Sequence, residues 1–176
     1  QEAIDFLEYI AGEGRRLQGE TTPSELPSKF AMTVRHPLGV VGCITPWNFP
    51  IAIPSWKIGA ALITGNTIVF KPASLTPLCA VAFVEIFGEA GLPPGVLNLV
   101  TGPADSVGRE IVEHPLVRAV SFTGGVPAGT DVYERSAKLL KRVELELGGK
   151  NPQIVMEDAD LDLAVDPAQR PREADI

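Results

Sequence analysis

From Val40 onward, short β-branched segments alternate with longer segments of helical periodicity, and this alternation constrains the fold more than any other feature of the chain. The expected strands are 40–44, 67–70, 95–100, 118–122 and 142–147, and the expected helices between them are 50–63, 77–90, 104–113 and 127–141. Because the connections are short, neighbouring strands must run parallel through crossover helices. The sequence therefore predicts an α/β fold in which helices cover both faces of a parallel sheet, with ligands bound at the carboxyl ends of the strands.

Several residues mark where these helices begin and end. Thr76 is the expected N-cap of the second helix, with Pro77 at its first position and Gly91 beyond its end. In the last helix, Leu139 and Leu140 are expected to lie on the apolar face. Before the first strand, the spacing predicts a helix over 3–17, then a loop over 19–28 and an extended segment over 30–34.

Composition excludes several classes of function. The net charge of −7 gives no basic surface for nucleic acid. The longest apolar stretch, Ile51–Ile63, is too short to span a bilayer, and no signal peptide is expected at the start of the chain. The two cysteines, Cys43 and Cys79, form no close pair, which favours a reducing, cytoplasmic location over a disulfide framework. No metal site is expected.

Asn48 lies in a rigid, mostly apolar turn directly after the expected strand 40–44. Pro46 and Pro50 fix the backbone on both sides of it. An amide held at the carboxyl end of a strand is well placed to donate hydrogen bonds into a crevice. The alternative is an ordinary Asx-turn, in which the side chain bonds only to its own backbone.

Two further polar residues, Lys71 and Glu146, follow or end other strands. Pro72 biases Lys71 toward an extended backbone, so its ammonium can reach over the edge of the sheet. The alternative for Lys71 is a surface lysine whose stem covers apolar neighbours. Glu146 shares its strand face with Glu144, and the alternative for both is the solvated side of an edge strand.

The stretch Phe122–Gly125 leads from a strand into a helix and contains two glycines. Backbone N–H groups exposed at such a point favour a phosphate group. The spacing differs from G-x-G-x-x-G, so the usual dinucleotide fingerprint is absent.

Four segments of the sequence, taken together, resemble the aldehyde dehydrogenase superfamily in their order and spacing. These segments are 45–50, 71–73, 120–124 and 146–150. The likeness covers residues 1–165, which implies an incomplete, Rossmann-like NAD(P)-binding domain. The segments 19–21 and 23–24 resemble bacterial semialdehyde dehydrogenases. After residue 165 the sequence diverges from the family pattern.

The resemblance implies roles for individual residues. Asn48 would donate its amide to the developing oxyanion, and Glu146 would be the general base that activates water. Cofactor contacts would come from the Lys-Pro-Ala segment, the glycine loop and their neighbours: Trp47, Lys71, Ala73, Ser74, Gly124, Gly125 and Leu147.

Two departures from the family pattern concern the cofactor, which would be NAD or NADP. Gly125 stands where many members have Ser, so one hydroxyl donor to phosphate is lost. Ser74 stands where NAD-preferring members often have Glu. Because no carboxylate would repel a 2′-phosphate there, we expect NADP to be tolerated.

The family's nucleophilic cysteine has no counterpart in this sequence. Cys43 and Cys79 do not occupy its position, and both are expected to be small buried hydrophobes. After Val165, Pro167 and Pro171 interrupt what would be a helix in the family. We interpret residues 166–176 as an unstructured tail that results from truncation or a shifted reading frame.

The leading hypothesis is an oxidoreductase that converts an aldehyde to the carboxylate with NAD(P)⁺ through a cysteine thioester. The fragment alone is expected to be inactive, and the full-length form is expected to be a homo-oligomer. The alternative is a non-catalytic nucleotide-binding fragment or pseudoenzyme. A third possibility is a reductase of acyl phosphates or acyl-CoA thioesters, but Glu146 argues against it because such enzymes generally lack the base.

Overall fold

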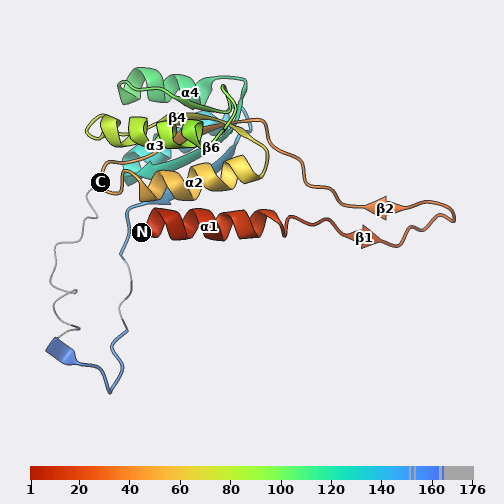
Figure 1. Cartoon of the computed structure of the whole chain (residues 1–176), viewed down its shortest axis with the longest axis horizontal. Coiled ribbons are helices and arrows are strands. Elements are labelled where there is room, and N and C mark those ends of the chain that lie inside the picture. The colour runs from red at the N-terminus through yellow and green to blue at the C-terminus, as the bar shows by residue number, and fades with distance from the viewer. Residues whose placement is uncertain (151, 153, 163, 165–176) are drawn as a thin grey trace.

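A five-stranded parallel sheet forms the centre of the computed structural model, which describes residues 1–150, 152, 154–162 and 164 (Figure 1). The strand order is β5–β4–β3–β6–β7, and all four pairings are parallel. The strands are β3 (Val40–Ile44), β4 (Thr67–Lys71), β5 (Leu97–Leu99), β6 (Val117–Gly124) and β7 (Arg142–Leu147). The helical elements are α1 (Glu2–Gly14), α2 (Ala52–Ile63), α3 (Pro77–Glu89), the π-helical segment η1 (Ala104–Gly108), α4 (Arg109–Glu113) and α5 (Val126–Ala137).

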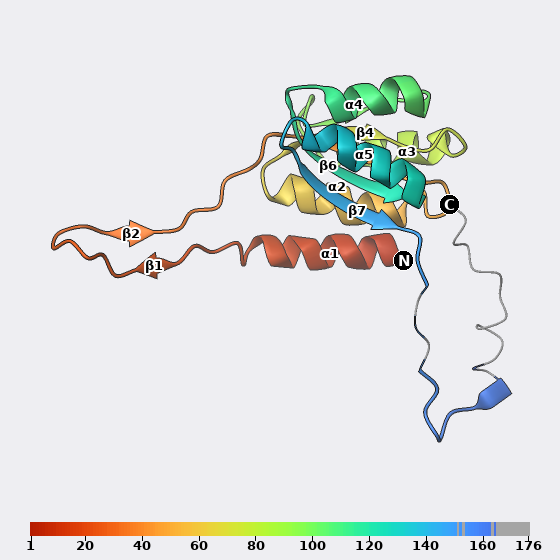
Figure 2. The same ribbon diagram turned by 180° about the vertical axis from the view of Figure 1, so that it is seen from behind.

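Helices cover both faces of this sheet, as predicted (Figure 2). On one face, Phe70 of β4 packs in an apolar cluster with Ile58 of α2. On the other face, Phe122 of β6 packs in a second cluster with Val132 of α5. The two clusters exist because successive side chains of a strand point to opposite faces. The fold is thus the expected α/β architecture.

The strand order reverses at β3, which has β4 on one side and β6 on the other. Ile44 at the end of β3 is in register with Lys71 and with Phe122, and Gly124 is in register with Leu147. The carboxyl ends of four strands therefore lie along one edge. In an open α/β sheet the crevice at such a reversal is the usual place for a ligand.

The helix boundaries agree only in part with those predicted from the sequence. Thr76 is the N-cap of α3 and Gly91 has a φ of +91°, as a glycine beyond a helix end should. The Thr76 hydroxyl nevertheless caps nothing, because its oxygen is buried without a partner among the described residues. Helix α2 begins at Ala52 rather than at Pro50, because Pro50 and Ile51 form a turn.

The prediction for the last helix was wrong at its end. Helix α5 stops at Ala137, and Leu140 has a φ of +51° and is 92% exposed. Leu139 is exposed as well, so neither leucine lies on a buried helical face. A left-handed residue cannot continue an α-helix, and the chain turns there into β7.

Residues 15–38 form an arm that projects away from the sheet, after α1 has packed along α2 (Figures 1 and 2). In the arm, β1 (Thr21–Thr22) pairs antiparallel with β2 (Ala31–Met32). The sequence predicted the extended segment but not the pairing, because two-residue strands carry no periodicity. The arm leaves Phe30, Met32 and Val34 exposed.

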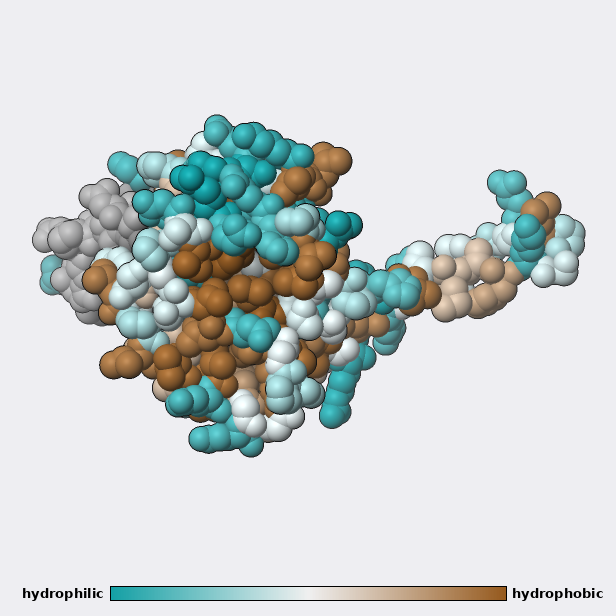
Figure 3. Space-filling view, turned by 90° about the horizontal axis from the view of Figure 1, so that it is seen from above, coloured by the Kyte–Doolittle hydropathy of each residue, from teal (hydrophilic) through white to brown (hydrophobic). Residues whose placement is uncertain are grey.

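Apolar surface is not confined to the arm. Figure 3 shows apolar patches among polar ones on the face of the body seen from above. Within the described part of the chain, no helix is both long enough and apolar enough to cross a membrane. The predicted tail over 166–176 lies outside the described residues, and the proposed boundary after 165 stays a prediction.

Replacement of Gly42 tests how closely β3 packs against α4. A Cβ atom on Gly42 would lie 2.4 Å from Cγ2 of Ile111, a buried β-branched side chain that cannot easily move. We expect G42A to lower the free energy of unfolding by about 1–3 kcal/mol, the usual cost of overpacking. Urea denaturation measures this.

Gly88 provides the matched control, since it is an exposed position of α3 with no atom within 4 Å of where a Cβ would lie. The variant G88A should gain up to about 1 kcal/mol through helix propensity. If both variants shift the urea midpoint in the same direction, the packing argument for Gly42 fails.

Candidate active site

Asn48 and Glu146 line one cleft of about 840 Å³ at the carboxyl edge of the sheet, on the face covered by α2. We call it the Asn48 cleft. Asn48 comes from the turn between β3 and α2, and Glu146 comes from the penultimate position of β7. Gly124 and Leu147, two residues predicted to contact the cofactor, line the same cleft. The structure thus brings together four of the predicted site residues.

Three polar atoms in the wall of the Asn48 cleft are buried without a hydrogen-bond partner among the described residues. They are Oδ1 of Asn48, Oγ1 of Thr123 and Nε1 of Trp56. The Asx-turn alternative for Asn48 is therefore wrong, since in that turn Oδ1 would accept a backbone hydrogen bond. Because buried polar atoms are usually satisfied, three unsatisfied atoms around one cleft are typical of a site that completes its hydrogen bonds with a ligand.

The two carboxylates of β7 differ in whether they have a partner among the described residues. Glu144 and Glu146 share one strand face, as predicted. Nζ of Lys57 lies 2.8 Å from Oε2 of Glu144. The Glu146 side chain is exposed and, within the described residues, makes neither a hydrogen bond nor an ion pair, so its carboxylate is available to a ligand or a water molecule.

Sequence reasoning missed Lys57 and Ser121 as parts of this cleft. Lys57 donates to Oγ of Ser121 at 2.9 Å, and its side chain is only 7% exposed. In the sequence Lys57 is only a polar residue that interrupts an apolar helix. That interruption was the available signal, because a charge on a buried helix face needs a partner.

Lys71 lies on the other face of the sheet, in a cleft of about 350 Å³ between η1, α4 and α5. We call it the Lys71 cleft. Lys71 is only 5% exposed, so the surface-lysine alternative is wrong. Its ammonium donates to the backbone oxygen of Pro72 at 3.3 Å and has no ion pair within the described part of the chain. Burial lowers the pKa of Lys71 below its ordinary value.

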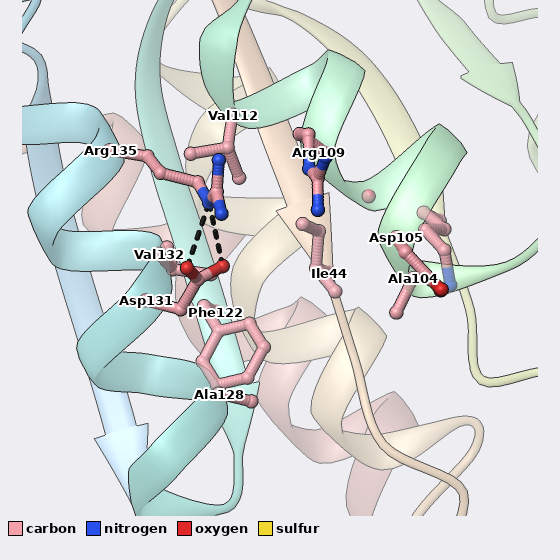
Figure 4. Close-up of a pocket in the computed structure, with 12 residues that line it drawn as sticks. Ile44, Ala104, Asp105, Arg109, Val112, Phe122, Ala128, Asp131, Val132 and Arg135 are labelled. Atoms are coloured by element: carbon pink, nitrogen blue, oxygen red, sulfur yellow. Dashed lines mark hydrogen bonds and ion pairs between the residues drawn. The ribbon is translucent and has the colours of Figure 1, made fainter.

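The rim of the Lys71 cleft is charged, whereas its walls are apolar (Figure 4). Nε of Arg135 donates to both carboxylate oxygens of Asp131 at 2.8 Å, and the second nitrogen of its guanidinium group reaches Glu113 of α4. The hydrogen bond from Arg135 lowers the pKa of Asp131. Phe122 and Lys71 both line the cleft, which thus combines an apolar wall with a cation that has no ion pair among the described residues.

The other predicted cofactor residues lie along the same edge. Ala73 and Ser74 line a third cleft, of about 300 Å³, beside the end of β5. Gly125 is the N-cap of α5, so the first N–H groups of this helix point to the edge. Trp47 is 48% exposed and lines none of the three clefts.

The cysteines do not belong to this edge. Cys43 is buried in β3, and burial raises its pKa to about 12, so its thiol stays protonated near neutral pH. Cys79 lies on α3 and is partly buried. Across the described residues, no group of three or more His, Cys, Asp or Glu side chains is placed to hold a metal ion.

Comparison with known proteins identifies the family of this chain. Residues 1–171 match the aldehyde dehydrogenase family. The chain belongs to that family. This confirms the resemblance drawn from the four sequence segments.

Similar aldehyde dehydrogenases include several that act on semialdehydes. The chain is 49% identical over 166 residues to succinate-semialdehyde dehydrogenase [NADP(+)] GabD of Escherichia coli, covering 94% of this chain and 34% of the relative. It is 49% identical to glutarate-semialdehyde dehydrogenase of Pseudomonas putida, covering 94% and 35%. A crystal structure of betaine aldehyde dehydrogenase from Staphylococcus aureus in complex with NAD⁺ superposes with a TM-score of 0.86 at 41% identity, covering 94% of this chain and 34% of that one. The chain thus spans about a third of the length of the relatives it matches.

Replacement of Lys71 tests whether its buried charge destabilises the fold. We expect K71M to raise the free energy of unfolding near neutral pH, because an unpaired buried ammonium is unfavourable. The folded-state pKa is below the ordinary value of 10.5, so the unfolded chain binds more protons and parental stability rises with pH between the two values. The advantage of K71M should therefore be largest below the folded-state pKa and shrink as the pH approaches 10.5.

Urea midpoints of parent and variant at several pH values measure this difference. K150M is the matched control, because Lys150 is exposed and should show little change. A K71M variant that is less stable than the parent at neutral pH would mean that the stem of Lys71 contributes more by packing than its charge costs.

Proposed function

We propose that this chain is part of the cofactor-binding region of an NAD(P)-dependent aldehyde dehydrogenase that oxidises a semialdehyde to the carboxylate. The observation that carries the proposal is the meeting of Asn48 and Glu146, which are far apart in the sequence, in one cleft at the strand reversal. The semialdehyde substrate is supported by the names of the relatives, both of which are semialdehyde dehydrogenases. The net reaction converts aldehyde, water and NAD(P)⁺ to carboxylate, NAD(P)H and two protons.

In this reaction Asn48 stabilises negative charge. When a cysteine from the rest of the protein attacks the aldehyde carbon, the carbonyl oxygen becomes an oxyanion, and the Asn48 amide donates a hydrogen bond to it. When bound, the nicotinamide supplies the acceptor for the hydride that leaves the same carbon. Glu146 then takes a proton from the water that hydrolyses the thioester. Its lack of a partner within the described residues supports this role, because the carboxylate is free to accept the proton.

The edge of the sheet also fits a dinucleotide. The unpaired ammonium of Lys71 is suited to the oxygens of a ribose or of a phosphate attached to it. The N-terminus of α5, beside Gly124, is suited to a pyrophosphate. A Cβ on Gly124 would lie 2.6 Å from the ring of Phe122, so any other residue here would force this ring or the strand end to shift.

Two broader properties belong to the same proposal. We infer a homo-oligomer for the whole protein, since the projecting arm leaves Phe30 and Met32 without a covering element among the described residues. We place the reaction in a reducing compartment such as the cytoplasm, because both cysteines are free.

Variants of Asn48 and Glu146 separate the two chemical steps in the protein that contains this chain. With N48A, the first turnover of NAD(P)H should slow by about 10²–10³, the usual effect of losing one oxyanion donor. With E146Q, the first turnover should persist while steady-state turnover falls by about 10²–10⁴, because only hydrolysis needs the base. Rapid-mixing absorbance of NAD(P)H distinguishes the two patterns.

E85Q is the control for the loss of a carboxylate, since Glu85 is exposed on α3 away from the clefts. If the unaltered protein binds cofactor but never produces NAD(P)H with any semialdehyde, the non-catalytic alternative replaces this proposal.

Replacement of Ser74 tests the preference between NAD and NADP. Since no carboxylate at this position repels a 2′-phosphate, the dissociation constants of NAD and NADP should differ by less than about a hundredfold. The variant S74E should weaken NADP by about tenfold or more and leave NAD nearly unchanged. Equilibrium binding by fluorescence measures both constants, with S24E on the arm as the control.

The prediction fails if NAD binds to the parent more than about a hundredfold tighter than NADP, or if S74E weakens both cofactors equally.

A further inference from the structure

Three elements meet at a charged cluster in the floor of the Asn48 cleft. Nζ of Lys57 on α2 donates to Oγ of Ser121 on β6 at 2.9 Å and to Oε2 of Glu144 on β7 at 2.8 Å. Ser121 in turn donates to the same carboxylate oxygen of Glu144. The cluster is closed, because each of its three members bonds to the other two.

Glu146 lies beside this cluster but takes no part in it. It is two residues beyond Glu144 on the same face of β7, a separation of about 7 Å along a strand. Both carboxylates and the Lys57 side chain line the same cleft. A lysine side chain has four rotatable bonds, so the ammonium that now pairs with Glu144 could also reach Glu146.

Few other charged groups face these two carboxylates. The described residues that line the cleft include Lys57 as their sole cation and Glu144 and Glu146 as their sole anions. Helix α1 contributes Phe6, and β6 contributes Ser121 and Thr123, none of which is charged. Behind the cluster, Cys43 stays neutral because burial raises its pKa to about 12. The position of the Lys57 ammonium therefore decides which of the two carboxylates is left without a counter-ion.

We propose that Glu144 is a positioning residue that holds Lys57 away from Glu146, so that the Glu146 carboxylate stays unpaired and able to take a proton from water. This inference rests on the function proposed above for Glu146. It assigns Glu144 and Ser121 a task without contact to the aldehyde: they hold the ammonium at Glu144, two residues before Glu146 on the strand. An ammonium paired with Glu146 would favour the ionised carboxylate and make it a weaker base.

The first arm of the test needs no enzymatic activity. Carbon-13 NMR of the full-length protein labelled at the glutamate carboxyl groups follows the titration of Glu146. In E144Q the midpoint of that titration should move to lower pH by about one unit, because Lys57 is no longer neutralised. In E144D the midpoint should stay near its value in the parent. In the double variant K57M/E144Q, which lacks the ammonium, the midpoint should return to the parental value.

The second arm measures steady-state aldehyde oxidation as a function of pH. E144Q should lower kcat by about tenfold near neutral pH and move the acid limb of the profile to lower pH, with little change in KM for the aldehyde. K57M/E144Q should restore the position of the limb, and E85Q should match the parent. A merely structural role for Glu144 would lower kcat without moving the limb, and the second substitution would not restore it.

The two arms keep this inference distinct from the function on which it rests. If E144Q leaves the Glu146 titration unchanged, or if removal of Lys57 does not reverse the shift, Glu144 does not hold the ammonium away and the inference is overturned. If the titration shifts as expected but neither parent nor variants oxidise any semialdehyde, the positioning role stands and the proposed function fails.

Discussion

The alternation of side chains along β6 and β7 determines what each face of this molecule can do. Ser121 and Thr123 point to the α2 face, whereas Phe122 between them packs into the cluster on the α5 face. On β7, Glu144 and Glu146 likewise share the α2 face, and Leu145 between them packs against the cluster under α5. Because the strands are parallel and in register, polar groups from both converge on one cleft while apolar groups anchor the sheet. A shift of one residue in the register of these strands would turn the polar side chains to the α5 face and the apolar side chains to the α2 face.

The sheet separates two buried cations. Lys57 of α2 lies on the α2 face and is neutralised there by Glu144. Lys71 reaches the opposite face and has no ion pair among the described residues. A charge that is buried and paired belongs to a fixed cluster, whereas a buried charge without a partner weakens the fold unless something binds it. The difference favours an architectural task for Lys57 and a ligand-binding task for Lys71.

Much of this arrangement could be predicted from the sequence. Strand-to-helix alternation was enough to place Asn48, Lys71 and Glu146 at the carboxyl edge, because position after a strand is a local property. The end of α5 was predicted incorrectly, since the left-handed turn at Leu140 has no glycine to mark it. The contact between Lys57 and Glu144 could not be predicted either. It depends on how closely α2 packs on the sheet, which periodicity does not encode.

Two glycines explain how closely the carboxyl edge of the sheet is packed on its α5 side. In α5, a Cβ on Gly129 would lie 2.4 Å from Cδ2 of Leu147, so this helix sits directly on the last residue of β7. That contact fixes β7, an edge strand with only one neighbouring strand, and with it the position of Glu146. At the adjacent end of β6, a Cβ on Gly124 would lie 2.6 Å from the ring of Phe122, so this glycine lets that ring pack closely against the strand end. Both glycines therefore permit close packing on the α5 side of the sheet, and that packing holds in place the strand ends whose opposite face carries Glu146.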